Sequence, residues 1–241
     1  MPLKGITIAT FLGCLVIAVG ITTGLWLHGN ANIVAQQNKS ISVTGSSRTP
    51  VEADLARWML NIDLKSYDNP DALAGAYNGI NEKKKRLLSL VEEKGISKDE
   101  ITFMPIQNMQ WYDNFTAQQM INVTLSVRVE SNKIDVIEEL SQDQQLTQDI
   151  LPSFSSVEYY YTKLAELRPT AIAEAAKDAK VRAEALAEVS NVKVGNLQTL
   201  KTGVIQVLPP NSVDVNDYGA YDLSTKKKEV MATVQATFDI R

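Results

Sequence analysis

The side chains that most often carry chemistry are scarce in this sequence. It has one cysteine, Cys14, and one histidine, His28, and both lie in or beside a hydrophobic segment near the N-terminus. Beyond residue 28 the chain therefore offers no thiol, imidazole or disulfide. This excludes zinc sites built on Cys or His, Cys–His nucleophiles and Ser–His–Asp triads from that part. We predict no catalytic residue, no cofactor and no metal site.

Carboxylates are the remaining candidates for acid–base chemistry, since paired carboxylates hydrolyse glycosides. They are scattered along the chain, and the loop over residues 209–226 holds Asp214 and Asp217. A calcium-loop interpretation of this loop fails, because Tyr218 takes a ligand position before Gly219 and the closing Glu is missing. We interpret the loop as solvated or as a subunit contact.

Charge argues against a nucleic-acid partner. The formal net charge is -4, and the first acidic residue is Glu52. Phosphate binding needs clustered Lys and Arg. The basic run Lys83–Arg86 has Glu82, Glu92 and Glu93 nearby, so we interpret it as a solvated helix face.

A long apolar run near the N-terminus predicts a membrane span. No charged residue occurs from Ile6 to Leu27. A helix of this length spans roughly 33 Å, against about 30 Å of hydrocarbon. Lys4 precedes the run and the next base is Lys39, so the positive-inside rule leaves the N-terminus in the cytoplasm and exports the rest. Positions through the predicted span are Ile6, Leu12, Val16, Gly20 and Leu27.

A cleaved signal peptide is the alternative to a retained anchor. Its apolar region is typically about 7–15 residues long and ends at a small-residue cleavage site. The run here is longer, and cleavage after Ala35 is poorly matched. We interpret Cys14 as a small apolar residue of the span and His28 as a polar residue at the interface. The predicted location is the inner (cytoplasmic) membrane, single-pass, with the C-terminal domain in the periplasm or outside.

The remaining sequence predicts one α+β domain. Residues 1–28 form the cytoplasmic tip and transmembrane signal-anchor, 29–39 a polar tether, and 40–241 the domain. Strict alternation from Ala56 to Leu64, from Met120 to Glu130 and from Glu229 to Ile240 predicts half-buried strands. The fold class is therefore α+β, a mixed or antiparallel sheet with helices packed on one face, preceded by one transmembrane helix.

Other elements follow from capping and breaking residues. We expect a turn at Arg48–Pro50, a helix that starts near Asp71 and ends at Gly95, and a helix from Pro169 to about Ser190. Single strands are expected over 101–111 and 197–208, and a short helix around 133–146.

Three phrases of the sequence resemble one known family. They are the opening ISVTGSSRTPVEADLARWMLNI, the helix end EEKGISKDEI and the alanine-rich LRPTAIAEAAKDAKVRAEALAEVSNVKVGNL. Together they resemble the SIMPL domain family of mostly bacterial envelope proteins, over about residues 40 to 241. Asn191 departs from the family pattern, where many members have Gly, and the long acidic loop is a second departure.

The resemblance implies a mixed sheet with helices on one side and association of the chain with itself. Family members have also been linked to oxidative-stress tolerance. It supplies no active site, so no catalytic residue is carried over.

We weigh three functions. The first is a membrane-tethered homo-oligomer, a ring or cage that contacts the lipid bilayer through its N-terminal helix. The second is a binding or sensing module for an envelope protein or a small ligand. Its candidate contacts are the loop aromatics Tyr112, Phe115, Tyr218 and Tyr221. The third, an enzyme acting through carboxylates alone, is the least favoured.

Overall fold

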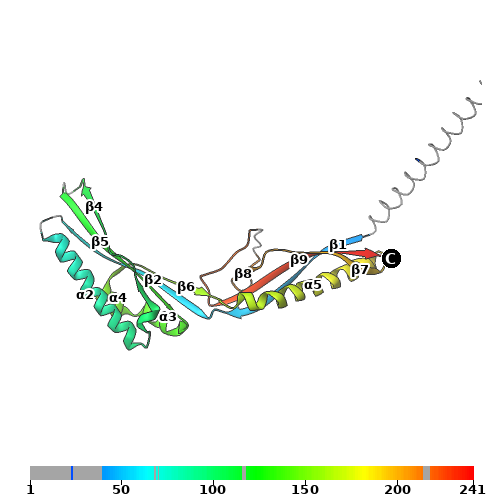
Figure 1. Ribbon diagram of the computed structural model, residues 1–241, viewed down its shortest axis with the longest axis horizontal. Coiled ribbons are helices and arrows are strands. Elements are labelled where there is room, and N and C mark those ends of the chain that lie inside the picture. Colours follow the sequence, from blue (N-terminus) through cyan, green and yellow to red (C-terminus); the bar gives the residue numbers. More distant parts are fainter. Residues whose placement is uncertain (1–22, 24–39, 68, 70, 116–117, 214–217) are drawn as a thin grey trace, which may run out of the picture. The chain divides into compact units, whose positions relative to one another are not determined.

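The computed structural model describes residue 23 and residues 40–67, 69, 71–115, 118–213 and 218–241. Within them the chain is α+β, with four α-helices and nine strands (Figure 1). The helices are α2 (Ala72–Glu93), α3 (Ile134–Gln142), α4 (Gln144–Ile150) and α5 (Leu164–Val189). The strands are β1 (Ser40–Glu52), β2 (Leu55–Tyr67), β3 (Ile101–Phe103), β4 (Gln107–Asp113), β5 (Gln118–Ser131), β6 (Pro152–Tyr160), β7 (Val194–Thr202), β8 (Gln206–Leu208) and β9 (Lys227–Ile240).

The predicted membrane span lies outside the described residues, and so do its positions Ile6, Leu12, Val16, Gly20 and Leu27. Among the residues that are described, no helix is both long and apolar enough to cross a bilayer. The span, the tether and the domain boundaries near residues 28 and 39 stay predictions.

The described chain divides into two compact units. One comprises residues 47–171 and 204–232, and the other includes residues 172–203 and 233–241 together with the start of β1. We call them the larger and the smaller unit. Strands β1 and β9 and helix α5 each contribute residues to both.

The larger unit is built on a five-stranded sheet of order β3-β5-β2-β6, with β4 also paired to β5. Its pairings are antiparallel, with Trp58 opposite Val129 and Leu60 opposite Val127. The alternation predicted for β2 and β5 is confirmed, since every second side chain is buried.

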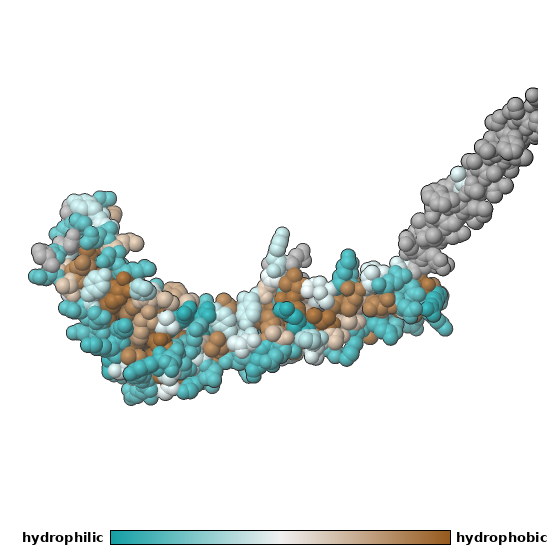
Figure 2. All heavy atoms as spheres, viewed as in Figure 1, coloured by the Kyte–Doolittle hydropathy of each residue, from teal (hydrophilic) through white to brown (hydrophobic). Residues whose placement is uncertain are grey.

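Three helices cover one face of this sheet (Figure 1). Apolar side chains of α2, α3 and α4 pack on the buried residues of β2 and β5, with Ile80, Leu87 and Ile137 fully buried. The visible outer side of the helices is largely hydrophilic, and hydrophobic side chains gather toward the strands (Figure 2). Gly95 follows α2 with φ +83°, a left-handed conformation that suits glycine, so the predicted helix end is confirmed.

The smaller unit packs an alanine face of α5 against strands. Ala175, Ala179, Ala183 and Ala187 are at most 2% exposed and recur every fourth residue. Ala175 and Ala179 lie directly over Gly45 of β1, where a Cβ would come within 2.6 Å of both residues. The small alanine side chains allow this close approach of helix and strand.

Several predicted elements differ from the structure. The turn expected at Arg48–Pro50 is wrong, because these residues belong to β1, an edge strand that tolerates Pro. Helix α5 starts at Leu164, ahead of Pro169, since Glu166 and Leu167 donate backbone hydrogen bonds to the Lys163 carbonyl.

Three stretches that were each predicted as one element contain two elements in the structure. Residues 101–111 form β3 and β4, residues 197–208 lie in β7 and β8, and residues 133–146 divide at Asp143 between α3 and α4. Asp143 breaks the helix because its carboxylate accepts hydrogen bonds from the Gln145 and Leu146 backbone N–H groups.

Candidate functional site

The face of the five-stranded sheet opposite the helices is a candidate surface of the larger unit. We call it the open face. The antiparallel register places Met59, Asn61 and Asp63 of β2 beside Ser126 and Thr124 of β5. These side chains are half-buried although the described helices pack on the other face. The open face is therefore mostly polar, and it carries the charged side chains of Asp63 and Arg128 among uncharged neighbours.

Three polar atoms on the open face are shielded from water and lack a hydrogen-bond partner in the described chain. They are Asp63 Oδ1, Asn122 Oδ1 and Arg128 Nε. The nearest carboxylate to Arg128 is Glu130, 4.0 Å away. Buried polar atoms are normally hydrogen-bonded. The open face thus offers polar atoms that a second surface would satisfy.

A network of charged side chains lies at one end of the open face. Arg57 Nε donates to Glu130 Oε1 at 2.6 Å, and Arg57 Nη1 donates to the Tyr160 hydroxyl at 2.6 Å. Burial acts to lower the pKa of Arg57, but the hydrogen bond to Glu130 and the charge of Glu158 outweigh it and raise the pKa. This end of the open face is held by internal ion pairs.

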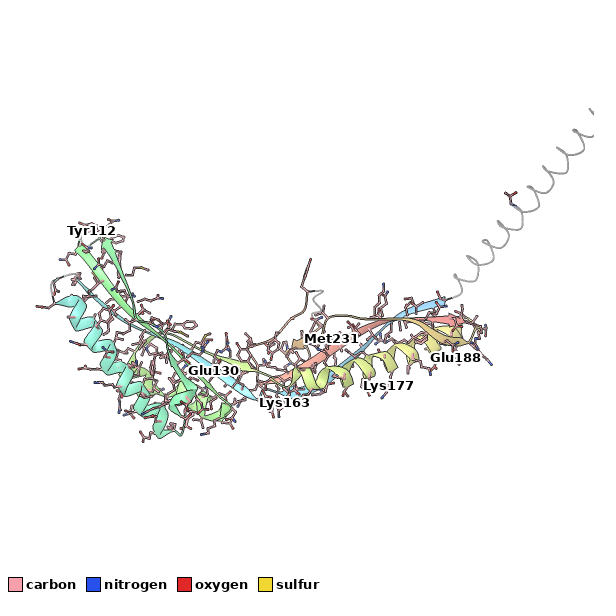
Figure 3. The ribbon with its side chains drawn as sticks, viewed as in Figure 1. Tyr112, Glu130, Lys163, Lys177, Glu188 and Met231 are labelled. Carbon is pink, nitrogen blue, oxygen red and sulfur yellow. The ribbon has the colours of Figure 1, made fainter. Side chains whose placement is uncertain are left out.

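The hairpin of β4 and β5 carries two of the four predicted contact aromatics. Tyr112 is 60% exposed and Phe115 is fully exposed. Tyr112 lies at the tip of the hairpin, and Glu130 lies at the other end of the same sheet (Figure 3). Met109 and Trp111 are also exposed on β4, so the exposed apolar surface extends from the tip along this strand.

The other two predicted contacts, Tyr218 and Tyr221, lie in the 209–226 loop of the same unit, away from the hairpin tip (Figure 1). Tyr218 is 96% exposed. The Tyr221 hydroxyl instead donates to the Tyr161 carbonyl at 3.0 Å and accepts from the Tyr161 N–H at 2.9 Å. The structure therefore brings the four aromatics together only in pairs, and it uses Tyr221 to hold the loop.

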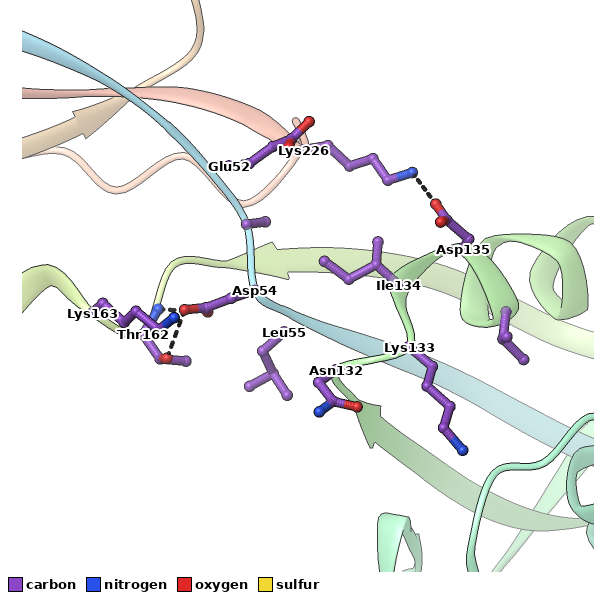
Figure 4. A pocket seen from close by; sticks show the side chains of 12 residues that line it. Glu52, Asp54, Leu55, Asn132, Lys133, Ile134, Asp135, Thr162, Lys163 and Lys226 are labelled. Carbon is purple, nitrogen blue, oxygen red and sulfur yellow. Dashed lines mark hydrogen bonds and ion pairs between the residues drawn. The ribbon is translucent and has the colours of Figure 1, made fainter.

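A cavity lies where β1 turns into β2. It measures about 920 Å³ and is open to solvent. Asp54, Lys163 and Lys226 line it (Figure 4). Asp54 accepts hydrogen bonds from the Thr162 backbone N–H at 2.8 Å and the Thr162 hydroxyl at 3.0 Å. The cavity mixes both signs of charge.

Lys226 ties this cavity to the start of α3. Its Nζ lies 2.8 Å from Asp135 Oδ1 (Figure 4). The same Nζ lies 2.6 Å from Glu138 Oε2. The Tyr159 hydroxyl donates to the other oxygen of Glu138 at 2.6 Å. We call these four residues the Lys226 cluster.

Hydrogen bonds within the Lys226 cluster stabilise the charged forms of Lys226 and Glu138. Hydrogen bonds to Asp135 and Glu138 raise the pKa of Lys226, while those from Lys226 and Tyr159 lower the pKa of Glu138. Burial, followed by the bond to Glu138, raises the pKa of Tyr159 to about 12. Lys226, Glu138 and Tyr159 thus keep their ordinary protonation states through neutral pH. General acid–base catalysis is best served by a pKa near the working pH. The pKa values of this cluster are shifted away from neutral pH, which suits ion pairs that stabilise the fold.

A second network, formed by hydrogen bonds and an ion pair around Asp222, fixes the end of the 209–226 loop. We call it the Asp222 network. Asp222 accepts hydrogen bonds from the Ser224 hydroxyl at 2.7 Å and from the Thr225 hydroxyl. Lys228, whose side chain is 0% exposed, reaches Asp222 Oδ2 at 3.0 Å. Burial acts to raise the pKa of Asp222, but the bonds from Thr225, Ser224 and Lys228 outweigh it and hold the pKa well below its usual range.

Replacing Asp222 by Asn is expected to lower the free energy of unfolding by about 2 kcal/mol at pH 7, because Lys228 loses its buried counter-charge. A carboxylate with a lowered pKa stabilises the fold above its unfolded pKa of about 3.9 and loses this contribution as the pH falls. The difference between wild type and Asp222→Asn should therefore shrink below about pH 4. Urea titrations at several pH values measure it.

The exposed acid Asp99 provides the matched control for that measurement. Asp99→Asn removes the same charge and is expected to change stability by less than about 0.5 kcal/mol. If Asp222→Asn lowers the free energy of unfolding at pH 7 no more than Asp99→Asn does, the proposed stabilising role of the Asp222 network is contradicted.

Sequence reasoning missed both charged arrangements. Lys226 lies far along the chain from Asp135 and Glu138, and only the fold brings them together. The one local signal was the i,i+3 spacing of the two acids on α3, which is common on solvated helix faces. Among the described residues, no three His, Cys, Asp or Glu side chains are placed to hold a metal ion.

Comparison with solved structures finds distant likenesses. A crystal structure of a hydrolase from Listeria innocua is 11% identical, with a TM-score of 0.22, and the match covers 81% of this chain and 92% of that one. A crystal structure of an uncharacterized conserved protein from Listeria innocua is 10% identical, with a TM-score of 0.21, over 78% and 92% of the two chains. A crystal structure of an amidase of the hydantoinase/carbamoylase family from Burkholderia multivorans is 11% identical, with a TM-score of 0.19, over 54% and 31%.

These TM-scores carry no inference about activity. No curated protein matches the chain. The family comparison is different in kind, because one family model, described as SIMPL, protein of unknown function (DUF541), matches residues 41–238. That range contains nearly all of the predicted domain and the three phrases in which the resemblance was found. The chain belongs to the SIMPL family.

Proposed function

We propose that the protein is a membrane-anchored envelope protein that assembles with copies of itself into a homo-oligomeric ring or cage. In this proposal it is a structural module and not an enzyme. The N-terminal helix lies in the inner membrane and the SIMPL domain lies in the periplasm or outside. A role in tolerance of envelope or oxidative stress rests on the family resemblance alone.

The observation that carries the proposal is the open face. A sheet that buries one face under helices and holds polar, half-buried side chains on the other has a broad surface available to another protein. Asp63 Oδ1 and Asn122 Oδ1 are already shielded from water on that face without a hydrogen bond. A neighbouring subunit would supply partners at little further cost of desolvation.

The electrostatics of the Lys226 cluster support a structural role. The pKa values of Lys226 and Glu138 are moved away from neutrality, and that of Tyr159 is about 12. Catalytic acids and bases are instead tuned toward the working pH. The ion pairs of Lys226 with Asp135 and Glu138 hold the 209–226 loop to α3.

The proposal is tested by co-purification of two differently tagged full-length copies expressed together. We expect each tag to recover the other copy. Thr124→Lys puts a long charged side chain at the centre of the open face and is expected to lower this recovery at least tenfold. Asn78→Lys, on the exposed side of α2, is the matched control and should leave recovery unchanged.

The outcome also separates the alternative function. A binding or sensing module is supported by the fully exposed Phe115 and by the cavity of about 920 Å³. If neither tag recovers the other copy, and a different envelope protein is recovered in constant proportion and is lost with Phe115→Ser, the assembly proposal is wrong and the binding module is favoured.

A further inference from the structure

Strand β4 is an edge strand with unusual exposure. It pairs with β5 on one side, from Gln107 opposite Thr124 to Asp113 opposite Gln118. Within the described residues no strand pairs with its other side. All positions from Gln107 to Tyr112 are exposed, and none of these residues is charged. The outer edge of β4 therefore presents free backbone donors and acceptors without a charge to repel another strand.

The opposite edge of the same sheet is protected. Strand β6 begins at Pro152 and carries Glu158. Part of its outer edge is also occupied, because the Tyr159 N–H donates to the Leu223 carbonyl at 2.8 Å. Proline, charge and coverage by a loop are the usual ways in which proteins block an edge strand.

The two edge strands of the other sheet, β1 and β7, are protected in another way. Strand β1 carries Arg48, Pro50 and Glu52. Strand β7 carries Lys201, and its register with β9 shifts twice between Val194 and Thr199. Such irregularities twist an edge and interrupt the ladder that a further strand would need. Strand β3 has three residues and is too short to template a partner. Among the described edges, β4 alone combines length, exposure and absence of charge.

We propose that β4 pairs antiparallel with β4 of a second copy of this chain and joins the two five-stranded sheets across a twofold axis. The inference rests on the self-assembly proposed above and names its contact. A second copy suits this edge because an uncharged strand can face itself without like-charge repulsion. An isologous contact of this kind closes a dimer, so a ring also needs a second interface, for which the open face is available.

The register follows from the length of the strand. Full overlap of Gln107–Asp113 with itself places Gln110, its midpoint, opposite Gln110 of the second copy. Met109 then lies opposite Trp111 of the second copy, on the open-face side, and Asn108 lies opposite Tyr112. Met109 is 68% and Trp111 is 37% exposed in the single chain. A sulfur–aromatic contact would bury both.

Disulfide trapping tests this register. In a Cys14→Ser background the chain has no other cysteine. Antiparallel partners have Cα atoms about 4.5–5.5 Å apart, within the range of a disulfide. Gln110→Cys is therefore expected to form a covalent dimer under mild oxidation, in full-length protein in membranes.

Position 108 provides the matched control. Two copies of residue 108 would lie four residues apart along the pair, or roughly 13 Å, which is beyond disulfide reach. Asn108→Cys should give no dimer, and the double variant Asn108→Cys with Tyr112→Cys should restore it. Equal cross-linking at positions 108 and 110, or a cross-link from 110 to a different protein, would overturn the proposal.

A charge variant gives an independent readout. Gln110→Lys places two ammonium groups across the axis and is expected to weaken the pairing at least tenfold. Gln119→Lys introduces the same charge on β5, one strand inward, and should have little effect. If the protein is a strict monomer, the proposed assembly fails too. If it is oligomeric but Gln110→Cys gives no dimer and Gln110→Lys has no effect, the β4 pairing alone is wrong.

Discussion

Deleting residues 1–28 is expected to release the protein completely from the membrane. No charged side chain occurs from Ile6 to Leu27, and each apolar side chain in such a run favours hydrocarbon over water. The full-length chain should remain in the pellet after an alkaline carbonate wash, whereas the deletion variant should be found entirely in the soluble fraction.

The control for this deletion is removal of the predicted tether, residues 29–39, which should leave the chain in the pellet. The intact mass of the membrane-bound protein distinguishes an anchor from a signal peptide. A mature N-terminus immediately after Ala35, with the protein in the soluble fraction, would contradict the retained anchor.

Gly45→Ala is expected to cause the largest loss of stability of any single methyl addition to the smaller unit. A Cβ at this position would lie 2.2 Å from the Ala175 carbonyl oxygen and 2.4 Å from the Ala179 backbone nitrogen. Backbone atoms of α5 cannot rotate away, so the helix must move off β1. Overpacking of this kind costs about 3 kcal/mol, which chemical denaturation of the purified protein would measure.

Gly75→Ala makes the same chemical change where there is room. Gly75 is exposed in the first turns of α2, and a Cβ there would meet no atom within 4 Å. Alanine in a helix is favoured over glycine by about 0.5–1 kcal/mol, so this variant should be more stable than wild type. Equal effects of the two variants would contradict the close packing of α5 on β1.

The parts of the fold that follow from local patterns could be predicted. The alternation in β2 and β5 specifies a sheet with one buried face, and the alanines of α5 specify a close approach. The structure departs from prediction where tertiary context outweighs local preference. Pro50 is accommodated because β1 is an edge strand, and Pro169 because the turn before it has its own hydrogen bonds.

The candidate site was less predictable than the fold. Loop position alone marked Tyr112 and Phe115, which are exposed, together with Tyr221, whose hydroxyl is bonded to Tyr161. Sequence does not say which side of a strand lacks a partner. The free edge of β4 and the Lys226 cluster depend on long-range pairing and became visible only in the folded chain.

The central claim is self-assembly, and the mass of the intact particle tests it most directly. Mass photometry of the full-length protein in detergent at micromolar concentration is expected to give one dominant species at an integer multiple, greater than one, of the 26.6 kDa chain after correction for the detergent. A single species at the mass of one chain across the concentration range would contradict the account.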